Sequence, residues 1–282
     1  MNDDSAFATH IRQWLVGFHG DIAPQSDETL ERRVHVYMRQ EQLYREKTRF
    51  LFSMLPRKPT IGLDIGSSAG GVSVALALEG VSMEGIEPSE SGVEVSKMRA
   101  RRLGIGNVRF QQSVGENLPF ANNSFDFAIS LAVLEHVQDV RAVVVETFRV
   151  LKPGAWAYFE VPNNLFPFEG HYKMAWLPMM PKSLAKVYVK ARGAYPKFLD
   201  HLHYMNRWIA MKHFREVGFI RIRDVYGDYL SGKVAGASWA ERAGRFSRVT
   251  WSAPIVRLVC GPLPTAWFLN RAVYLIAMKP NE

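Results

Sequence analysis

The fold is decided by residues 61–71, Ile61-Gly-Leu-Asp-Ile-Gly-Ser-Ser-Ala-Gly-Gly71, which run from a short apolar strand into a glycine-rich turn. The apolar segment 72–78 follows directly and predicts a helix. Where glycines join a strand to a helix, a ligand can lie against bare backbone near the positive end of the helix dipole. The sequence therefore predicts a ligand-binding strand–turn–helix unit.

The spacing of the glycines distinguishes between classes of ligand. Dinucleotide sites carry G-x-G-x-x-G, whereas here Asp64 precedes Gly66 by two residues and Gly70 follows it by four. This arrangement resembles the D-x-G-x-G-x-G loop of class I S-adenosylmethionine-dependent methyltransferases, with Ser68 in place of the middle glycine. The resemblance implies that these four residues bind the cofactor, and that Asp64 faces the amino group of its methionine part.

A second acidic residue, Glu87, ends the next predicted strand, 81–86. An acid about 20 positions after the glycine turn, at the carboxyl end of a strand, is placed to bind a ribose diol. A carboxylate accepts hydrogen bonds from both hydroxyls. We therefore expect Glu87 to bind the ribose of the cofactor. The alternative is a solvated acid at the end of a strand.

Further motifs follow in a fixed order within residues 60–163. They are Leu118-Pro-Phe, Phe125-Asp, Leu134-Glu-His-Val and Arg149-Val-Leu-Lys-Pro-Gly. The series resembles that of the small-molecule and lipid methyltransferases that include the ubiquinone and menaquinone C-methylases. An ordered series is much more specific than any single motif. The resemblance implies an α/β fold with a Rossmann-like, seven-stranded, mostly parallel sheet, helices on both faces and an antiparallel last strand.

One position departs from the resembled pattern. Related enzymes often read Gly-Asp-Ala-Glu before Leu-Pro-Phe, with the Asp on the adenine amino group, but here Val114 replaces that Asp. Adenine recognition is therefore expected from backbone groups around Gly115 or from Glu116. The resemblance also places Leu131, at the end of the fourth strand, beside the sulfonium. The departure keeps open an alternative function, a non-catalytic S-adenosylmethionine-binding protein that retains the fold.

Hydrophobic periodicity organises the rest of the chain. Strands are predicted near 61–65, 81–86, 107–112, 125–131, 155–161, 219–225 and 271–278, and helices near 70–79, 89–103, 138–151 and 206–217. Residues 1–59 form a predicted N-terminal helical segment, with one helix from about residue 28 to 54, that packs over the cofactor site. Residues 60–282 form the methyltransferase domain, with helical cap insertions at 164–204 and 229–270.

Composition limits the compartment and the class of protein. A chain of 282 residues with 48% hydrophobic content can bury one large core. Cys260 is the single cysteine, which excludes an internal disulfide and fits a reducing compartment. No run of about 18 uncharged apolar residues occurs, and the acidic start lacks the basic region of a signal peptide. We therefore expect a cytoplasmic protein.

The two insertions differ in charge from the motif-bearing core. Both are net basic, whereas residues 60–163 are net acidic, and both are rich in aromatic residues, with methionines in the first. Such surfaces suit an apolar acceptor, and residues 245–271 interleave arginines with tryptophans and aliphatic residues, as interfacial elements do. The sequence predicts a small-molecule, sugar or lipid-linked acceptor and peripheral contact with the inner face of the membrane. The alternative is a buried cap over a soluble acceptor. No nucleic acid partner is expected, and the oligomeric state stays open.

The catalytic residues leave a weaker signature than the cofactor loop. Methyl transfer requires alignment, exclusion of water and, for some acceptors, removal of a proton. His171, in the first insertion, and His136, after the fourth strand, are candidate general bases because imidazole titrates near neutrality. The alternative for each is a packing role. His201-x-His203 has the spacing of a metal pair, but no set of carboxylates or cysteines accompanies it, so no metal is expected.

Overall fold

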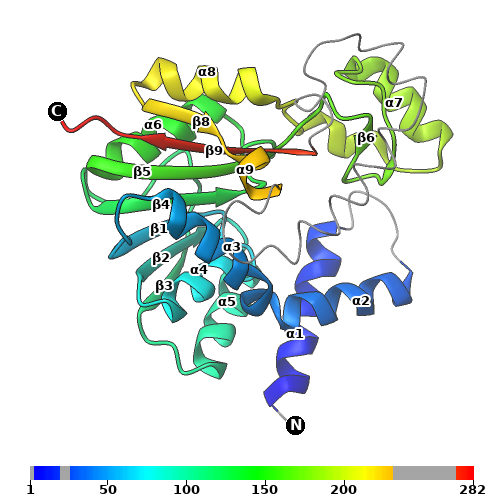
Figure 1. The fold of residues 1–282 in the computed structure, drawn as a ribbon. Helices are drawn as coiled ribbons and strands as arrows, with labels where there is room; N and C mark the ends of the chain where they lie inside the picture. The colour runs from blue at the N-terminus through cyan, green and yellow to red at the C-terminus, as the bar shows by residue number, and fades with distance from the viewer. Residues whose placement is uncertain (1–2, 20–25, 231–270) are drawn as a thin grey trace.

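The computed structural model describes residues 3–19, 26–230 and 271–282, which are built around a seven-stranded sheet (Figure 1). The strand order is β3-β2-β1-β4-β5-β9-β8. The strands are β1 Ile61–Ile65, β2 Ser82–Glu87, β3 Val108–Gln112, β4 Phe125–Leu131, β5 Leu151–Pro162, β8 Ile220–Asp224 and β9 Ala272–Met278. β9 runs antiparallel to both of its neighbours, β5 and β8, and the pairs from β3 to β5 are parallel. The predicted mostly parallel sheet with an antiparallel last strand is confirmed.

Helices cover both faces of this sheet (Figure 1). α6 Val140–Val150 and α8 Arg207–Val217 lie on one face, and α3 Gln40–Met54, α4 Gly71–Leu78 and α5 Glu90–Arg102 lie on the other. Successive strand residues point to opposite faces. Ala128 therefore packs in the core under α6 and α8, while Phe127 and Ile129 pack in the core under α3, α4 and α5. Both faces of the central strands are therefore buried, as the near-continuous apolar runs require.

The prediction of one helix from residue 28 to 54 is wrong, because the chain breaks at Arg39. α2 Asp27–Met38 ends there and α3 begins at Gln40, with Arg39 at φ −119° and ψ 22°. The two halves bury their apolar sides against different partners. Leu30 and Val34 pack with α1 Asp3–His19, whereas Phe50 and Leu51 pack in the sheet-face core with α4. A single straight helix cannot satisfy both contacts.

A buried arginine ties this break to the glycine loop. The Arg99 side chain is fully buried and forms an ion pair with Glu41. Its Nε donates to the Ala69 carbonyl at 2.8 Å, and Nη2 donates to the Tyr37 carbonyl at 2.5 Å, near the end of α2. The Tyr37 carbonyl, in the last turn of α2, thereby gains a side-chain donor. One guanidinium thus connects α5, the glycine loop, α2 and α3.

The first insertion folds as a small unit with its own core. A hairpin of β6 Phe168–Glu169 and β7 Met174–Ala175 leads into α7 Lys182–Ala191 and the 3₁₀ helix η1 Pro196–Asp200. The core residues are Met174, Trp176, Met180, Ala185, Val189, Leu199 and Leu202. A hydrogen bond joins the two ends of the insertion: Asn164 Oδ1 accepts from the Met205 amide at 2.7 Å.

The second predicted insertion, 229–270, lies almost entirely outside the described residues. α9 Tyr226–Leu230 is the last described element before it. Of the basic and aromatic stretch 245–271, only Arg271 is described. In the part of the chain that the structure describes, no helix is both long and apolar enough to cross a membrane.

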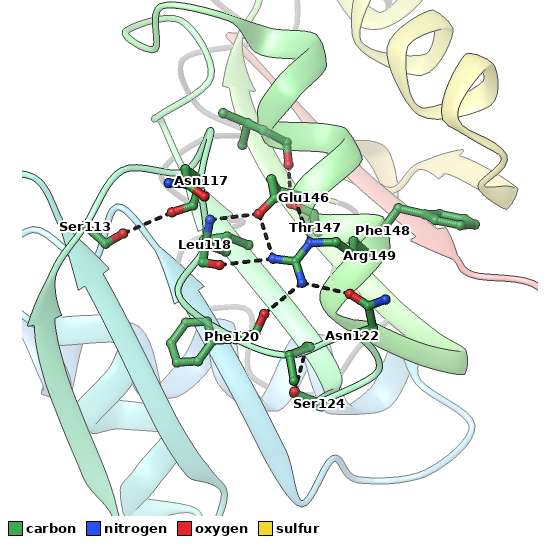
Figure 2. Close-up of polar contacts among 12 residues, drawn as sticks. Ser113, Asn117, Leu118, Phe120, Asn122, Ser124, Glu146, Thr147, Phe148 and Arg149 are labelled. Carbon is green, nitrogen blue, oxygen red and sulfur yellow. Dashed lines mark hydrogen bonds and ion pairs between the residues drawn. The ribbon is translucent and has the colours of Figure 1, made fainter.

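The loop between β3 and β4 is held by Arg149 of α6 (Figure 2). The guanidinium donates to the carbonyls of Leu118 and Phe120 at 3.0 and 2.7 Å, and it pairs with Glu146 at 2.7 Å. Glu146 also accepts a hydrogen bond from the Leu118 amide at 2.8 Å. Two motifs that lie far apart in the sequence therefore meet, and their contact fixes the loop that also carries Gly115.

The buried ion pair gives a test of how strongly the N-terminal helices are coupled to the domain. Arg99→Met should lower the free energy of unfolding by about 3–5 kcal/mol, because it leaves the Glu41 carboxylate buried without its partner. The measurement is urea denaturation followed by circular dichroism. The double variant Arg99→Met/Glu41→Leu should recover part of the loss, since no buried charge remains. Arg101→Met, an exposed position on the same helix, is the matched control, and a loss in Arg99→Met no larger than in this control would contradict the prediction.

Candidate active site

The glycine loop after β1 has no room for side chains at its two key positions. Gly66 and Gly70 both have φ of +75°, a region that residues with a Cβ rarely adopt. A Cβ on Gly66 would lie 2.4 Å from Val133 Cγ2, and one on Gly70 would lie 2.9 Å from Phe110 Cζ. The loop therefore lies directly against Val133, in the segment that follows β4. This contact places the predicted cofactor loop beside the Leu-Glu-His-Val motif.

Glu87 lies at the carboxyl end of β2 beside this loop. Its carboxylate accepts hydrogen bonds from the amides of Ser68 at 3.0 Å and Ser89 at 3.2 Å. Burial raises the pKa of Glu87, and the two N–H donors oppose that rise. Ser68 itself has a φ of 55°. Glu87 thus shapes the loop, and its contact with a ribose, like the cofactor role of Ser68, stays a prediction.

Asp64 is buried near the carboxyl end of β1. It accepts a hydrogen bond from Ser73 Oγ at 2.5 Å. Burial raises the pKa of Asp64 to about 7, with the Ser73 hydrogen bond opposing the rise and the Glu87 charge adding to it. A positively charged group beside Asp64 would favour the ionised form. The carboxyl is therefore poised to respond to the ammonium group that the resemblance places next to it.

Ser67 is a residue of the loop to which the sequence assigned no role. Its Oγ is buried and has no hydrogen-bond partner among the described residues. Buried hydroxyls are normally paired, so this oxygen is available to a ligand in the loop. Its only sequence signal is its place between Gly66 and Ser68.

The N-terminal helices pack next to the glycine loop, and their predicted position over a bound cofactor stays a prediction. A Cβ added to Gly71 would lie 2.6 Å from Gln40 Cγ of α3, and one added to Gly92 would lie 3.1 Å from Trp14 Nε1 of α1. Trp14 also packs edge-on against Tyr37 of α2, with ring centroids 5.2 Å apart. All three N-terminal helices thus contribute side chains to this region.

The remaining predicted cofactor residues lie on neighbouring segments. A Cβ on Gly115 would be 3.1 Å from Ile65 Cγ2 at the end of β1, and Leu131 is the last residue of β4. Glu116 Oε1 accepts hydrogen bonds from the amides of Gln138 at 2.8 Å and Asp139 at 3.4 Å. One oxygen of Glu116 therefore anchors the segment before α6. Binding of adenine by any of these groups stays a prediction.

The two predicted catalytic histidines meet, although they come from distant segments. His136 follows β4, His171 lies in the turn of the β6–β7 hairpin, and their ring centroids are 5.0 Å apart. Glu135 Oε1 lies 3.8 Å from His136 Nε2. The nearest ligand atoms of Glu135, His136 and His171 all lie within 4.8 Å of one another. Phe198 packs against both imidazole rings. We refer to Glu135, His136 and His171 as the Glu-His-His cluster.

Buried carboxylates control the electrostatics of this cluster. Glu169 Oε1 lies 2.6 Å from His171 Nδ1. Burial disfavours the charged imidazole, but the hydrogen bond and charge of Glu169 outweigh it and raise the pKa of His171. Burial raises the pKa of Glu135 to about 7, although its own backbone N–H and the His171 charge oppose the rise. Glu135 Oε2 is buried without a hydrogen-bond partner among the described residues.

Sequence reasoning named the two histidines and missed the carboxylates around them. Glu135 stands in the Leu-Glu-His-Val motif, which was a signal, whereas Glu169 had none beyond its position two residues before His171. His203 serves the packing of the same loop, because its Nε2 lies 2.8 Å from the Val137 carbonyl and its amide donates to the Glu135 carbonyl at 2.8 Å.

Comparison with known proteins identifies the class of domain. Residues 63–159 match the family described as "Methyltransferase domain". An uncharacterized methyltransferase, YcgJ of Bacillus subtilis, is 40% identical over 90 residues, which cover 32% of this chain and 36% of the relative. A ubiquinone biosynthesis O-methyltransferase of Pseudomonas fluorescens is 32% identical over 126 residues, which cover 41% of this chain and 53% of the relative. The chain thus spans between a third and about half of these curated relatives.

Solved structures agree with this class at the level of the fold. The crystal structure of YcgJ covers 83% of this chain and 98% of that chain, with a TM-score of 0.51 at 21% identity. Phosphoethanolamine N-methyltransferase 2 of Haemonchus contortus, solved with S-adenosyl-L-methionine, covers 83% of this chain and 52% of that chain, with a TM-score of 0.52 at 19% identity. The chain contains a class I S-adenosylmethionine-dependent methyltransferase domain.

The raised pKa of Asp64 predicts a pH-dependent affinity for the cofactor product. The free protein holds Asp64 protonated below pH 7, whereas the ligand's ammonium group favours the carboxylate, so binding must release a proton. Affinity for S-adenosylhomocysteine should therefore rise from pH 5 to 7, approaching about tenfold per pH unit, and level off above. Calorimetry across this range measures it. Asp64→Asn should flatten most of the profile, leaving only the part due to Glu87. A wild-type affinity that does not change with pH would show that Asp64 does not face the ammonium.

Proposed function

We propose that this protein transfers the methyl group of S-adenosylmethionine to a hydroxyl group of a small or lipid-linked acceptor. S-adenosylmethionine is the methyl donor of the class to which the domain belongs. The observation that carries the proposal is the contact of Gly66 with Val133, because it sets the cofactor loop beside the Glu-His-His cluster. The methyl donor and the three side chains of the cluster then lie on adjoining loops at the carboxyl ends of β1 and β4.

The cluster favours a hydroxyl among possible acceptor groups. A neutral amine can attack the sulfonium before it loses a proton, but a hydroxyl is a weak nucleophile until its proton leaves. In the reaction, the acceptor oxygen forms a bond to the methyl carbon, the carbon–sulfur bond breaks, and its electron pair returns to sulfur. Three titratable side chains beside the donor site are suited to promote the loss of the proton. One similar protein named above is a ubiquinone O-methyltransferase and the other a phosphoethanolamine N-methyltransferase. Their names therefore do not decide between oxygen and nitrogen as the acceptor atom.

Glu87 provides the test of the donor site. Glu87→Ala should weaken binding of S-adenosylhomocysteine by about 10- to 150-fold, because a charge-assisted hydrogen bond is lost. Calorimetry measures the affinity, with the nearby exposed Glu90→Ala as the control. Unchanged affinity in Glu87→Ala would remove the ribose assignment.

A turnover assay separates the enzyme from a non-catalytic binder. Wild-type protein should convert S-adenosylmethionine to S-adenosylhomocysteine when hydroxyl-bearing lipid extracts are added. Binding of the cofactor without turnover on any acceptor fraction would favour the alternative function, a binding protein that retains the fold.

The cap presents a surface that suits the acceptor side of this proposal. On α7, Leu184 and Val187 are 51% and 67% exposed and lie on one side of the helix. Lys182, Lys186 and Lys190 follow at four-residue spacing on the same helix, and Lys182 and Lys186 also contact Asp200 of η1. Apolar side chains bordered by cations are typical of helices that lie at an anionic membrane surface. We infer peripheral contact through α7, which would bring the cluster near lipid-linked acceptors.

Vesicle flotation tests the membrane contact. The protein should float with phosphatidylglycerol vesicles at low salt and less at high salt, because salt screens surface charges. Replacing Lys182, Lys186 and Lys190 by Glu should abolish flotation, since each cation near the surface contributes about 1 kcal/mol. Lys212→Glu on the exposed side of α8 is the control. If the wild-type protein does not float at low salt, the acceptor is soluble.

A further inference from the structure

We propose that the Glu-His-His cluster is a binding site for a divalent transition-metal ion of the Zn²⁺ type. This inference rests on the proposed function, because it states how the cluster would promote loss of the acceptor proton. It also revises the sequence-based expectation of no metal, which considered only His201 and His203. The ligands proposed here come instead from the loop after β4 and from the cap hairpin.

The spacing of the ligand atoms suits such an ion. One atom from each of Glu135, His136 and His171 lies within 4.8 Å of the other two, and the Glu135 Oε1 to His136 Nε2 distance is 3.8 Å. In a tetrahedral site with bonds of about 2.1 Å, ligand atoms lie about 3.4 Å apart. Small rotations of the side chains would therefore close the site. Glu135 and His136 are adjacent in one loop, and the hairpin that carries His171 already packs against it.

Two further observations point to a missing cation. Glu135 Oε2 is buried and has no hydrogen-bond partner among the described residues, and a buried carboxylate oxygen normally has one. In addition, Glu169 occupies Nδ1 of His171 at 2.6 Å, which leaves Nε2 for a ligand. A carboxylate on the far nitrogen of a histidine is the usual support of a metal-bound imidazole, because it fixes the tautomer and orientation of the ring.

The donor set indicates the class of ion. Two imidazoles and one carboxylate favour Zn²⁺, Fe²⁺, Co²⁺ or Ni²⁺ over Mg²⁺ and Ca²⁺, which prefer oxygen ligands. Three protein ligands leave at least one position open. An acceptor hydroxyl that binds there becomes more acidic, releases its proton to water, and attacks the methyl carbon while the carbon–sulfur electron pair returns to sulfur. This role needs no change in the oxidation state of the ion.

Metal titration of the full chain tests the site without an activity assay. Protein stripped with a chelator is titrated with Co²⁺, whose visible absorption bands report histidine ligation, and Zn²⁺ affinity is measured by competition with a chromophoric chelator. The wild-type protein should bind one equivalent. Glu135→Gln and His171→Ala should each weaken binding at least 10-fold. Glu169 is not a proposed ligand but orients His171, so Glu169→Gln should weaken binding about 10- to 100-fold.

His201→Ala is the matched control, because this exposed histidine belongs to the same insertion and should leave metal affinity unchanged. Thermal melts and S-adenosylhomocysteine affinity establish that each variant is folded. No Co²⁺ spectrum in the wild-type protein, or equal affinity in Glu135→Gln and His171→Ala, would overturn the site. Turnover that persists in excess chelator would also overturn it while leaving the proposed function intact. Metal bound with the predicted variant pattern, but no turnover, would instead refute the proposed function alone.

Discussion

The buried guanidinium of Arg99 is the interaction on which the glycine loop depends. A fully buried charge is tolerated only when it is paired and its donors are used, and Arg99 achieves this through Glu41, the Tyr37 carbonyl and the Ala69 carbonyl. Two of these partners belong to the N-terminal helices and one to the glycine loop. The match to the methyltransferase family begins only at residue 63, yet the loop inside it is held by residues before it. The N-terminal helices are therefore part of the architecture of the site.

Several of the recognisable motifs stabilise the backbone of the fold and take no part in the chemistry. Asp126 accepts hydrogen bonds from the amides of Thr60 and Ile61 at 3.1 and 3.0 Å, so it fixes the start of β1. Arg149 fixes the loop before β4. Gly154 has a φ of +74°, and a Cβ there would lie 2.5 Å from Asn281 Oδ1. Each motif marks a place where backbone groups need one particular partner, which explains why the series identifies the fold and the donor but not the acceptor.

The strands and helices of the sheet could be predicted from the sequence because they follow from local patterns. Buried strands are short apolar runs, and glycines with positive φ mark the turns between them. The break at Arg39 could not be predicted in this way, because it depends on which surface each half of the segment contacts. The contacts of His171 could not be predicted in this way either. His171 lies 36 positions after Glu135 and reaches it only through the folding of the insertion, and Glu169 acquires its role through the geometry of a two-residue hairpin strand.

The acceptor side of the site arises where the shared domain meets the insertion. Glu135 and His136 belong to the region that matches the family, residues 63–159, whereas His171 and Glu169 lie outside it. The match to the family therefore covers the first pair of residues and not the second. The donor can thus be argued from the relatives, while the acceptor must be argued from this chain. Because His171 and Glu169 come from the insertion, the proposed chemistry depends on how the β6–β7 hairpin packs against the loop after β4.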